Sequence, residues 1–374
     1  MLNRLRLFAA GFTDQEVELY QLKKLPYPDL ATNFLSHKDN NRIFRKILNA
    51  SHQKYILEDK WAAHHFLSGC GFPVPVTYGL YHPELGLAHD GSRFCKQEDF
   101  ERIFSDSHTI KLVFKPRGGR QGRNLFVAKF FMDDSSKKIT VEFNGHRLTL
   151  NDFLRQLPVD AYKEYDGGYH GWIVQKYINQ HEIISKLYPN TVNTVRLVTF
   201  LTLDNQVDYH FAILRLGRDG RPGDNWASGG VSVGIDLDTG MLKNGVLKPK
   251  YGGTWVTKHP DTEVKFKDVR LPYWNEMLDL SAKAARQFSG VRSVGWDIAV
   301  SQNGPMIVEA NAEWDLAMVQ AHSATGYLTP KIREELLKFG VQFSDTLPSL
   351  SRSLPRVIIR RLMMSRLGKY FKMY

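Results

Sequence analysis

Apolar residues recur along this chain at two spacings, which separate expected strands from expected helices. Short apolar runs bounded by glycine, proline or polar residues predict strands. These runs are residues 112–115, 125–128, 172–175, 194–202, 209–216, 231–237, 295–300 and 306–311. Spacings of three and four predict helices at residues 40–50, 59–69, 150–157, 275–288 and 330–339. Because several strands follow one another with no helix between them, the pattern predicts an α+β or mixed α/β class.

The last two expected strands carry three polar residues among apolar ones. The turn between them contains Asn303-Gly304, a pair that favours a tight hairpin. Residues two apart on a strand point the same way, so Glu309 and Asn311 share a face, which Asp297 can reach from the neighbouring strand. Three converging oxygen donors suit Mg²⁺, which also keeps positions for phosphate oxygens. The alternative is a half-buried hairpin with a few solvated polar residues.

A cationic, glycine-rich loop follows the expected strand at residues 112–115. Lys115 ends this strand, and residues 116–123 contain three glycines and three arginines. Glycines let a backbone approach a ligand closely, and backbone N–H groups together with a lysine can bind phosphates. The loop is not a Walker A motif, because the lysine precedes the glycines. Its alternative is a glycine-rich hairpin with a surface lysine.

Composition narrows the class of protein. The 374 residues are 43% hydrophobic, enough for a sizeable core in one large domain or a few smaller ones. No apolar run reaches the roughly 18 to 20 residues of a membrane-spanning helix, and acidic residues follow the N-terminal apolar stretch too closely for a signal peptide. Cys70 and Cys95 form no disulfide framework or zinc pattern, so we expect reduced thiols in a cytoplasmic protein.

The net charge of +11 permits an anionic partner. No recognition helix, zinc finger or aromatic RNA-binding motif is present in the sequence, so nucleic acid is not expected. Residues 352–374 contain arginines and lysines but no acid, interleaved with apolar residues. This pattern predicts a basic amphipathic helix. Such a helix would touch an anionic membrane at its inner face, bind a glycan-assembly protein, or pack on its own protein.

The order of these features resembles the ATP-grasp superfamily. A lysine beside an acid opens a helix at Asp59-Lys60, and Lys115 precedes the glycine loop. The later phrases are Asn193-Thr194-Val195-Arg196, Leu214-Arg215-Leu216-Gly217, Asp224-Asn225 with Gly229-Gly230, Gly295-Trp296-Asp297-Ile298-Ala299 and Glu309-Ala310-Asn311. Over roughly residues 54–320, these phrases look most like the sugar-transfer-associated ATP-grasp group found among polysaccharide biosynthesis proteins.

The resemblance implies an α+β fold of two lobes that clasp ATP. The implied segments are a helical N-terminal extension over residues 1–50, a first lobe with a glycine-rich flap over 51–182, a second lobe with a magnesium site over 183–330, and C-terminal helices with a basic tail over 331–374. A full N-terminal α/β domain usually precedes the lobes in this superfamily. The short extension here therefore implies a different wall around the substrate.

The resemblance also implies roles for individual residues at a nucleotide site. Lys60 and Lys115 would contact the phosphates, Gly118, Gly119 and Gly122 would form the flap, Gln175 and the backbone of Lys176 and Ile178 would meet the adenine edge, and Glu182 would accept from the ribose hydroxyls. The magnesium ion, with Mn²⁺ as an alternative, would be held by Asp297, Glu309 and Asn311.

The position of a catalytic arginine is left open by the same resemblance. Many family members carry an arginine two residues before the first metal-binding acid, and this chain has Gly295 there. Arg196 or Arg215 would then supply the positive charge. The substrate segment would include Asp224, Asn225, Gly229 and Gly230, unless these residues form a surface loop.

The implied reaction joins a carboxylate to an amine and cleaves ATP to ADP. The carboxylate attacks the γ-phosphate, and the amine then displaces phosphate from the acyl phosphate. The acid or amine would be an acidic sugar, an amino acid or a glycan precursor. Two alternatives stay open: a kinase of a sugar or lipid carrier, and a non-catalytic nucleotide-binding scaffold on a membrane-associated glycan assembly.

Overall fold

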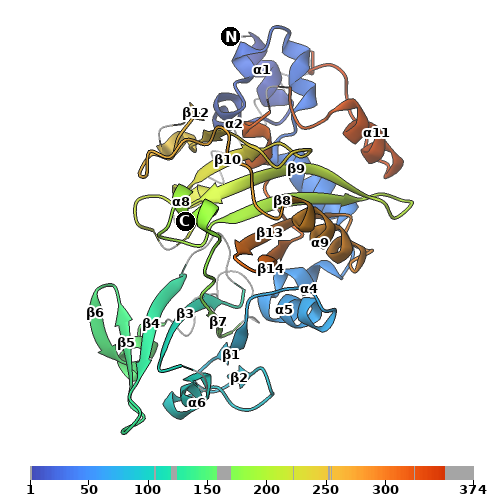
Figure 1. Ribbon diagram of the computed structural model, residues 1–374. Coiled ribbons are helices and arrows are strands. Elements are labelled where there is room, and N and C mark those ends of the chain that lie inside the picture. Colours follow the sequence, from blue (N-terminus) through green and yellow to red (C-terminus); the bar gives the residue numbers. More distant parts are fainter. Residues whose placement is uncertain are drawn as a thin grey trace, which may run out of the picture.

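Two antiparallel sheets of seven strands each form the frame of the protein, and helices pack around them (Figure 1). The computed structural model describes residues 2–104, 107–118, 124–157, 170–221, 223–251, 253, 255–323 and 325–349. In Figure 1 the first sheet lies below the second, and the N-terminal helices lie beyond the second sheet. The architecture is therefore α+β, as the order of strands and helices in the sequence predicts.

The first sheet has the strand order β2-β1-β7-β3-β4-β5-β6. Its strands are β1 (Thr77–Tyr81), β2 (Leu87–Ala88), β3 (Thr109–Pro116), β4 (Phe126–Met132), β5 (Ile139–Phe143), β6 (His146–Thr149) and β7 (Trp172–Lys176). Burial alternates along β3, so Leu112 and Phe114 point into a phenylalanine-rich core. Val113 and Lys115 alternate with these two residues along the strand and face a cavity instead.

The second sheet has the strand order β12-β11-β10-β9-β8-β13-β14. Its strands are β8 (Thr194–Leu201), β9 (Val207–Leu216), β10 (Val231–Ile235), β11 (Leu242–Val246), β12 (Trp255–Val256), β13 (Ser293–Ser301) and β14 (Gly304–Asn311). All residues of β8 are buried, because both faces of this part of the sheet are covered. One face packs on α9 (Trp274–Arg286) through a core that includes Leu197 and Trp296.

The other face of the second sheet is shared between the N-terminal extension and the cavity. Alternation along β8 puts its even-numbered residues on this face. Val198 and Phe200 pack against apolar residues of the segment 35–48. Thr194 and Arg196, nearer the start of the strand, line the cavity. One strand thus presents an apolar half to the extension and a polar half to the site.

The helices are mostly short and connect or cover the sheets. They are α1 (Leu2–Ala9), α2 (Asp14–Leu19), α3 (His37–Asn40), α4 (Lys54–Glu58), α5 (Lys60–Gly69), α6 (Gln97–Glu101), α7 (Leu150–Leu154), α8 (Glu182–Leu187), α10 (Leu316–Ala321) and α11 (Pro330–Lys338), with a π-helical segment at η3 (Asn41–Leu48) and 3₁₀ turns at η1 (Leu22–Lys24), η2 (Pro28–Asn33), η4 (Arg102–Phe104), η5 (Trp226–Ser228) and η6 (Pro249–Tyr251). Although α4 and α5 precede the first sheet in sequence, their residues Leu57 and Leu67 belong to the core of the second.

The expected strands and helices that fall within the described residues are all present, and the α+β class is confirmed. The strands β1, β2, β5, β6, β11 and β12 have no counterpart in the sequence prediction. The basic helix expected at residues 352–374 lies outside the described residues, and the boundaries proposed for the four segments stay predictions. In the part of the chain that the structure describes, no helix is long and apolar enough to cross a membrane.

Candidate active site

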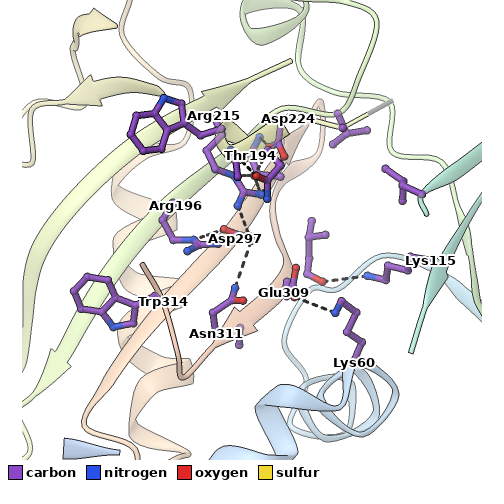
Figure 2. A pocket seen from close by; sticks show the side chains of 18 of the residues that line it. Lys60, Lys115, Thr194, Arg196, Arg215, Asp224, Asp297, Glu309, Asn311 and Trp314 are labelled. Atoms are coloured by element: carbon purple, nitrogen blue, oxygen red, sulfur yellow. Dashed lines mark hydrogen bonds and ion pairs between the residues drawn. The ribbon is translucent and has the colours of Figure 1, made fainter. Parts of the chain in front are cut away.

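A cavity of about 510 Å³ lies between the two sheets. The first sheet contributes Lys115 and Gln175 to its wall, and β8, β9, β13 and β14 contribute the opposite side. Helix α5 adds Lys60, and the N-terminal extension adds His37, Asn40 and Arg45. Figure 2 shows Lys60 and Lys115 facing the polar side chains of the second sheet across this space.

The hairpin of β13 and β14 brings the three expected metal ligands together. Its register pairs Asp297 with Glu309 and Gly295 with Asn311. Asn311 Nδ2 lies 3.4 Å from Asp297 Oδ2, and the side chains of all three residues line the cavity. Strand alternation thus places the donors on one face, as the sequence pattern predicts. Figure 2 shows Asn311 on one side of Asp297 and Arg215 on the other.

Two arginines hold the carboxylate of Asp297. Arg196 donates from Nε to Oδ1 at 2.5 Å and from Nη2 to Oδ2 at 3.0 Å. Arg215 Nη1 lies 3.2 Å from Oδ2. Only 1% of Asp297 is exposed, and burial by itself would raise the pKa of its carboxyl. The two guanidinium groups outweigh burial and hold this pKa below its ordinary value, so the group is a carboxylate at neutral pH.

A second buried carboxylate holds Arg215 from the other side. Arg215 Nη2 donates to Asp224 Oδ1 at 3.1 Å, and its Nε and Nη2 donate to Thr194 Oγ1 at 3.1 and 2.8 Å. Asp224 Oδ2 accepts from the N–H and the hydroxyl of Thr194 at 2.9 and 2.6 Å. Burial would lower the pKa of Arg215, but Asp224 and Asp297 raise it above its ordinary value. Asp224 lines the cavity, but its carboxylate is engaged by Thr194 and Arg215, and the substrate contact expected for it stays a prediction.

Two lysines face the carboxylates from the other side of the cavity. Lys60 Nζ lies 3.2 Å from Glu309 Oε1, and Lys115 Nζ donates to the carbonyl of Val308 at 3.4 Å. Burial lowers the pKa of Lys115 to about 8, Glu309 partly opposes this shift, and Lys60 adds to it. An anion bound between these lysines would reverse the shift, because it would stabilise the charged form of Lys115.

A contact between Asp59 and Arg117 fixes the positions of both lysines. Asp59 caps the N-terminus of α5 by accepting from the N–H groups of Trp61 and Ala62. Its carboxylate also accepts from Arg117 Nη2 at 2.6 Å and from Nε at 2.9 and 3.1 Å. Lys60 is the first residue of α5, and Arg117 follows the end of β3 two residues after Lys115. This ion pair therefore ties the helix that carries one lysine to the strand that carries the other.

A comparison with known protein families identifies the family to which this chain belongs. Residues 39–333 match the model of the family described as sugar-transfer associated ATP-grasp. The chain belongs to this ATP-grasp family. The resemblance inferred from the sequence is thereby confirmed. A comparison with curated protein sequences gave no match.

Three solved structures that resemble this ATP-grasp protein are distant from it in sequence. N5-carboxyaminoimidazole ribonucleotide synthetase from Thermotoga maritima has 10% identity and a TM-score of 0.36, covering 74% of this chain and 49% of that one. A biotin carboxylase complex from Campylobacter jejuni has 11% identity and a TM-score of 0.40, covering 75% and 48%. The ATP-grasp ligase PsnB has 13% identity and a TM-score of 0.36, covering 78% and 64%. The chain spans about half the length of the first two of these structures.

In this ATP-grasp protein the expected adenine contacts are only partly brought together. Gln175, Lys176 and Ile178 line the cavity, but Gln175 Nε2 donates to Thr77 Oγ1 at 2.8 Å and the N–H of Lys176 donates to the carbonyl of Val76 at 2.9 Å. The structure does not bring Glu182 to the cavity. It is exposed at the start of α8, where the N–H of the preceding residue donates to the carbonyl of Val300 near the tip of the β13–β14 hairpin.

The glycines expected near the nucleotide or the substrate do not line the cavity where the structure describes them. Gly118 does not line the cavity, and Gly119 and Gly122 lie outside the described residues. Gly229 and Gly230 are not part of the cavity wall either. A Cβ at Gly230 would come within 2.7 Å of the carbonyl oxygen of Leu216, so this glycine serves close backbone packing rather than substrate contact. Asn225, from the same segment, does line the cavity.

The chemistry of the donor set fits a magnesium–nucleotide complex. Asp297, Glu309 and Asn311 offer oxygen atoms on one face of the hairpin, and the protein's own cations contact both carboxylates. Across the described residues, no three of the His, Cys, Asp and Glu side chains gather closely enough to hold a metal. An ion here would therefore depend on Asn311 and on phosphate oxygens as well, as Mg²⁺ in nucleotide sites commonly does.

Sequence reasoning missed several residues that build the site. Thr194 lies in a phrase that pointed to the family, yet its contact with Asp224 could not be read from that phrase. An N-cap preference at Asp59 was a usable signal for its position on α5, but not for its pairing with Arg117. The cavity residues His37, Asn40 and Arg45 carried no recognisable motif, because they reach the site only through packing of the N-terminal extension on the second sheet.

Proposed function

We propose that this protein is an ATP- and Mg²⁺-dependent carboxylate–amine ligase. The observation that carries the proposal is the grouping of Lys60 and Lys115 opposite Asp297, Glu309 and Asn311 around one cavity. Membership of the ATP-grasp family supports ATP as the nucleotide. Among the similar structures, a carboxylase domain is described in complex with MgADP, ADP and bicarbonate, and PsnB is described as a ligase with Mg and ADP.

The charges of the site suit phosphoryl transfer. Such a reaction needs positioning and charge neutralisation more than covalent work by the protein. Lys60 and Lys115 would bind the phosphates, and the buried arginines would face the developing negative charge. When bound, Mg²⁺ would be held by Asp297, Glu309 and Asn311 and would neutralise charge on the phosphate oxygens.

The proposed ligation has two steps, phosphoryl transfer and amide formation. A substrate carboxylate oxygen attacks the γ-phosphorus of ATP, the bond to the bridging oxygen breaks, and ADP leaves. An amine nitrogen then attacks the acyl carbon, phosphate leaves with the bonding electrons, and the nitrogen loses a proton to form the amide. Because the first step brings two anions together, it requires the cationic side of the cavity.

The end of the cavity near the N-terminal extension supports a place for the acid and amine. Arg45, Glu313 and Asp315 line this end, and Arg45 Nη1 lies 3.4 Å from Glu313 Oε2. Among the described residues, Asn40 Oδ1 and Arg45 Nε are buried without a hydrogen-bond partner. Polar atoms of this kind are rare in folded proteins, and substrate hydroxyl or amine groups would satisfy them. A glycan precursor, in keeping with the family's association with sugar transfer, or an amino acid carries such groups.

ADP release tests the proposal directly. The protein is incubated with ATP, Mg²⁺ and pairs of candidate acids and amines, and products formed in a cell extract supplied with ATP are identified by mass spectrometry. A ligase yields an amide and ADP, whereas a sugar or lipid-carrier kinase yields a stable phosphorylated product. The Glu309→Ala variant should lose Mg²⁺-dependent nucleotide binding. Absence of nucleotide binding by the unaltered protein would contradict both enzyme hypotheses.

A further inference from the structure

The two arginines at Asp297 are held in unequal ways. Arg215 donates to Thr194 and Asp224 as well as contacting Asp297, so three different groups surround its guanidinium. Within the described part of the chain, the hydrogen bonds of Arg196 both go to Asp297. If Asp297 turned its oxygens elsewhere, Arg215 would keep two partners and Arg196 would keep none of these bonds.

The anchor of Arg215 does not depend on Asp297. Asp224 accepts from the N–H and hydroxyl of Thr194, and the same hydroxyl accepts from Arg215. Thr194 lies opposite Arg215 in the β8–β9 register, so this contact is set by the sheet itself. Only 8% of Arg215 is exposed. A buried guanidinium with its own carboxylate has little reason to move when a neighbouring charge is neutralised.

Gly295 makes room for Arg196 beside Asp297. Arg196 stands on β8 directly opposite Asp297 on β13, and Gly295 is two residues before Asp297. A Cβ at position 295 would lie 3.1 Å from Arg196 Cδ and 2.8 Å from Trp314 Cβ. Any larger side chain there would therefore displace the stem of Arg196 or the tryptophan. Figure 2 shows Arg196 on the side of Asp297 that faces Trp314, away from Lys115.

We infer that Arg196 is the arginine that leaves Asp297 and binds the transferred phosphoryl group, while Arg215 is a positioning residue that stays with Thr194 and Asp224. The inference rests on the proposed function, because it requires a nucleotide in the cavity. Arg196 donates to both oxygens of Asp297, and Arg215 and Asn311 also contact Oδ2, so a divalent cation would compete with Arg196 for this carboxylate. The released guanidinium is a planar, bidentate donor beside a cavity for phosphates, which is the chemistry that arginine suits best.

Two binding measurements separate the roles of the arginines. Calorimetry of ADP binding over a range of Mg²⁺ concentrations reports competition for Asp297. Calorimetry of the ATP analogue AMP-PNP at saturating Mg²⁺, compared with ADP, reports contact with the γ-phosphoryl position. Arg196→Gln should lower the half-saturating Mg²⁺ concentration about tenfold, because a competing cation is removed. It should also reduce the preference for AMP-PNP over ADP about tenfold.

Four further variants distinguish these roles from loss of structure. Arg215→Gln should lower the melting temperature and leave the preference for AMP-PNP in place, whereas Arg286→Gln, at an exposed position of α9 outside the cavity, should behave as the unaltered protein. Arg196→Lys keeps the charge without the bidentate fork and should fall between the unaltered protein and Arg196→Gln. Gly295→Ala should shift both readouts in the direction of Arg196→Gln, because its Cβ crowds the Arg196 stem.

The possible outcomes lead to different conclusions. If the unaltered protein binds ADP with Mg²⁺ but Arg196→Gln and Arg196→Lys match it in Mg²⁺ requirement and in nucleotide preference, the inference is overturned and the proposed function stands. A loss of the AMP-PNP preference in Arg215→Gln instead of Arg196→Gln would exchange the two roles and also overturn it. If the unaltered protein binds no nucleotide with Mg²⁺, the proposed function fails and the inference fails with it.

Discussion

The two sheets that enclose the cavity contribute to it in different ways. In the first sheet, β3 alternates between a phenylalanine-rich core and the cavity, and its main charge at the site is Lys115. In the second sheet, charged side chains are buried within the sheet itself, and they pair with each other across strands. These residues are Arg196, Arg215 and Asp297, joined by Asp224 from the loop between β9 and β10.

This difference indicates which side of the site is preorganised. The buried charges of the second sheet are already paired with one another before any ligand binds, because each would be costly to leave unpaired. Lys115 has no carboxylate partner within ion-pair distance among the described residues, and burial lowers its pKa. We therefore expect changes in the second sheet to affect stability and binding together, and changes in the first sheet to affect mainly binding.

Removing the charge at Asp297 should have the largest effect. The Asp297→Asn variant leaves Arg196 and Arg215 buried without their shared carboxylate, so we expect a loss of about 3–5 kcal/mol in the free energy of unfolding and no Mg²⁺-dependent nucleotide binding. Urea unfolding and calorimetry measure the two effects. Asp238→Asn, at an exposed turn, is the matched control. A loss below about 1 kcal/mol would contradict the view that the second sheet's charges are mutually dependent.

Replacing the lysine of the first sheet should weaken binding without destabilising the protein. Lys115→Met removes a buried, poorly compensated charge and one phosphate contact, so the nucleotide Kd should rise about 10- to 100-fold while the melting temperature stays equal or increases. Lys129→Met, at an exposed position of β4 outside the cavity, should change neither quantity. A marked drop in melting temperature for Lys115→Met alone would show that this lysine also supports the fold.

The same lysine predicts how binding depends on pH. Its pKa of about 8 in the empty protein means that the cationic form is lost as pH rises through this value, so nucleotide affinity should fall about tenfold per pH unit above it. The sign for stability is opposite: the folded pKa lies below the ordinary value of 10.5, so the empty protein should gain stability from pH 8 to 10.5. Calorimetry from pH 7 to 9 checks the affinity, and Lys115→Met should lose this dependence.

Breaking the ion pair between Asp59 and Arg117 should have the smallest effect. Asp59→Asn retains the N-cap of α5 but loses the charge that pairs with Arg117, which we expect to cost about 1 kcal/mol or less and to raise the nucleotide Kd a few-fold. A double-mutant cycle with Arg117→Gln measures the coupling. Strictly additive losses would mean that the contact does not tie α5 to the end of β3.

Asn-Gly pairs in the sequence show how far a local pattern could predict the hairpins of this fold. Asn303-Gly304 correctly located the turn between β13 and β14, where Gly304 takes a φ of +117°. Asn144-Gly145, with φ values of 50° and 77°, joins β5 and β6 and was an equally good signal. Ile139, Val141 and Phe143 alternate with polar residues along β5, but the hairpin was not predicted because its second strand, β6, is short, mostly exposed and without apolar alternation. The two-residue strands β2 and β12 offer no periodicity at all.

The order of residues along the chain was enough to predict that Asp297, Glu309 and Asn311 converge, because strand alternation and a tight turn between two strands are local properties. It also determined the family, through phrases that need no coordinates. The folded arrangement of the strands was needed to show that Arg196 and Arg215 hold Asp297, since the registers of β8 with β13 and with β9 join residues far apart in the chain. It likewise decided that Glu182 lies outside the cavity and that residues 37–45 help to wall it, because neither fact has a local cause: both follow from how distant segments pack on the second sheet.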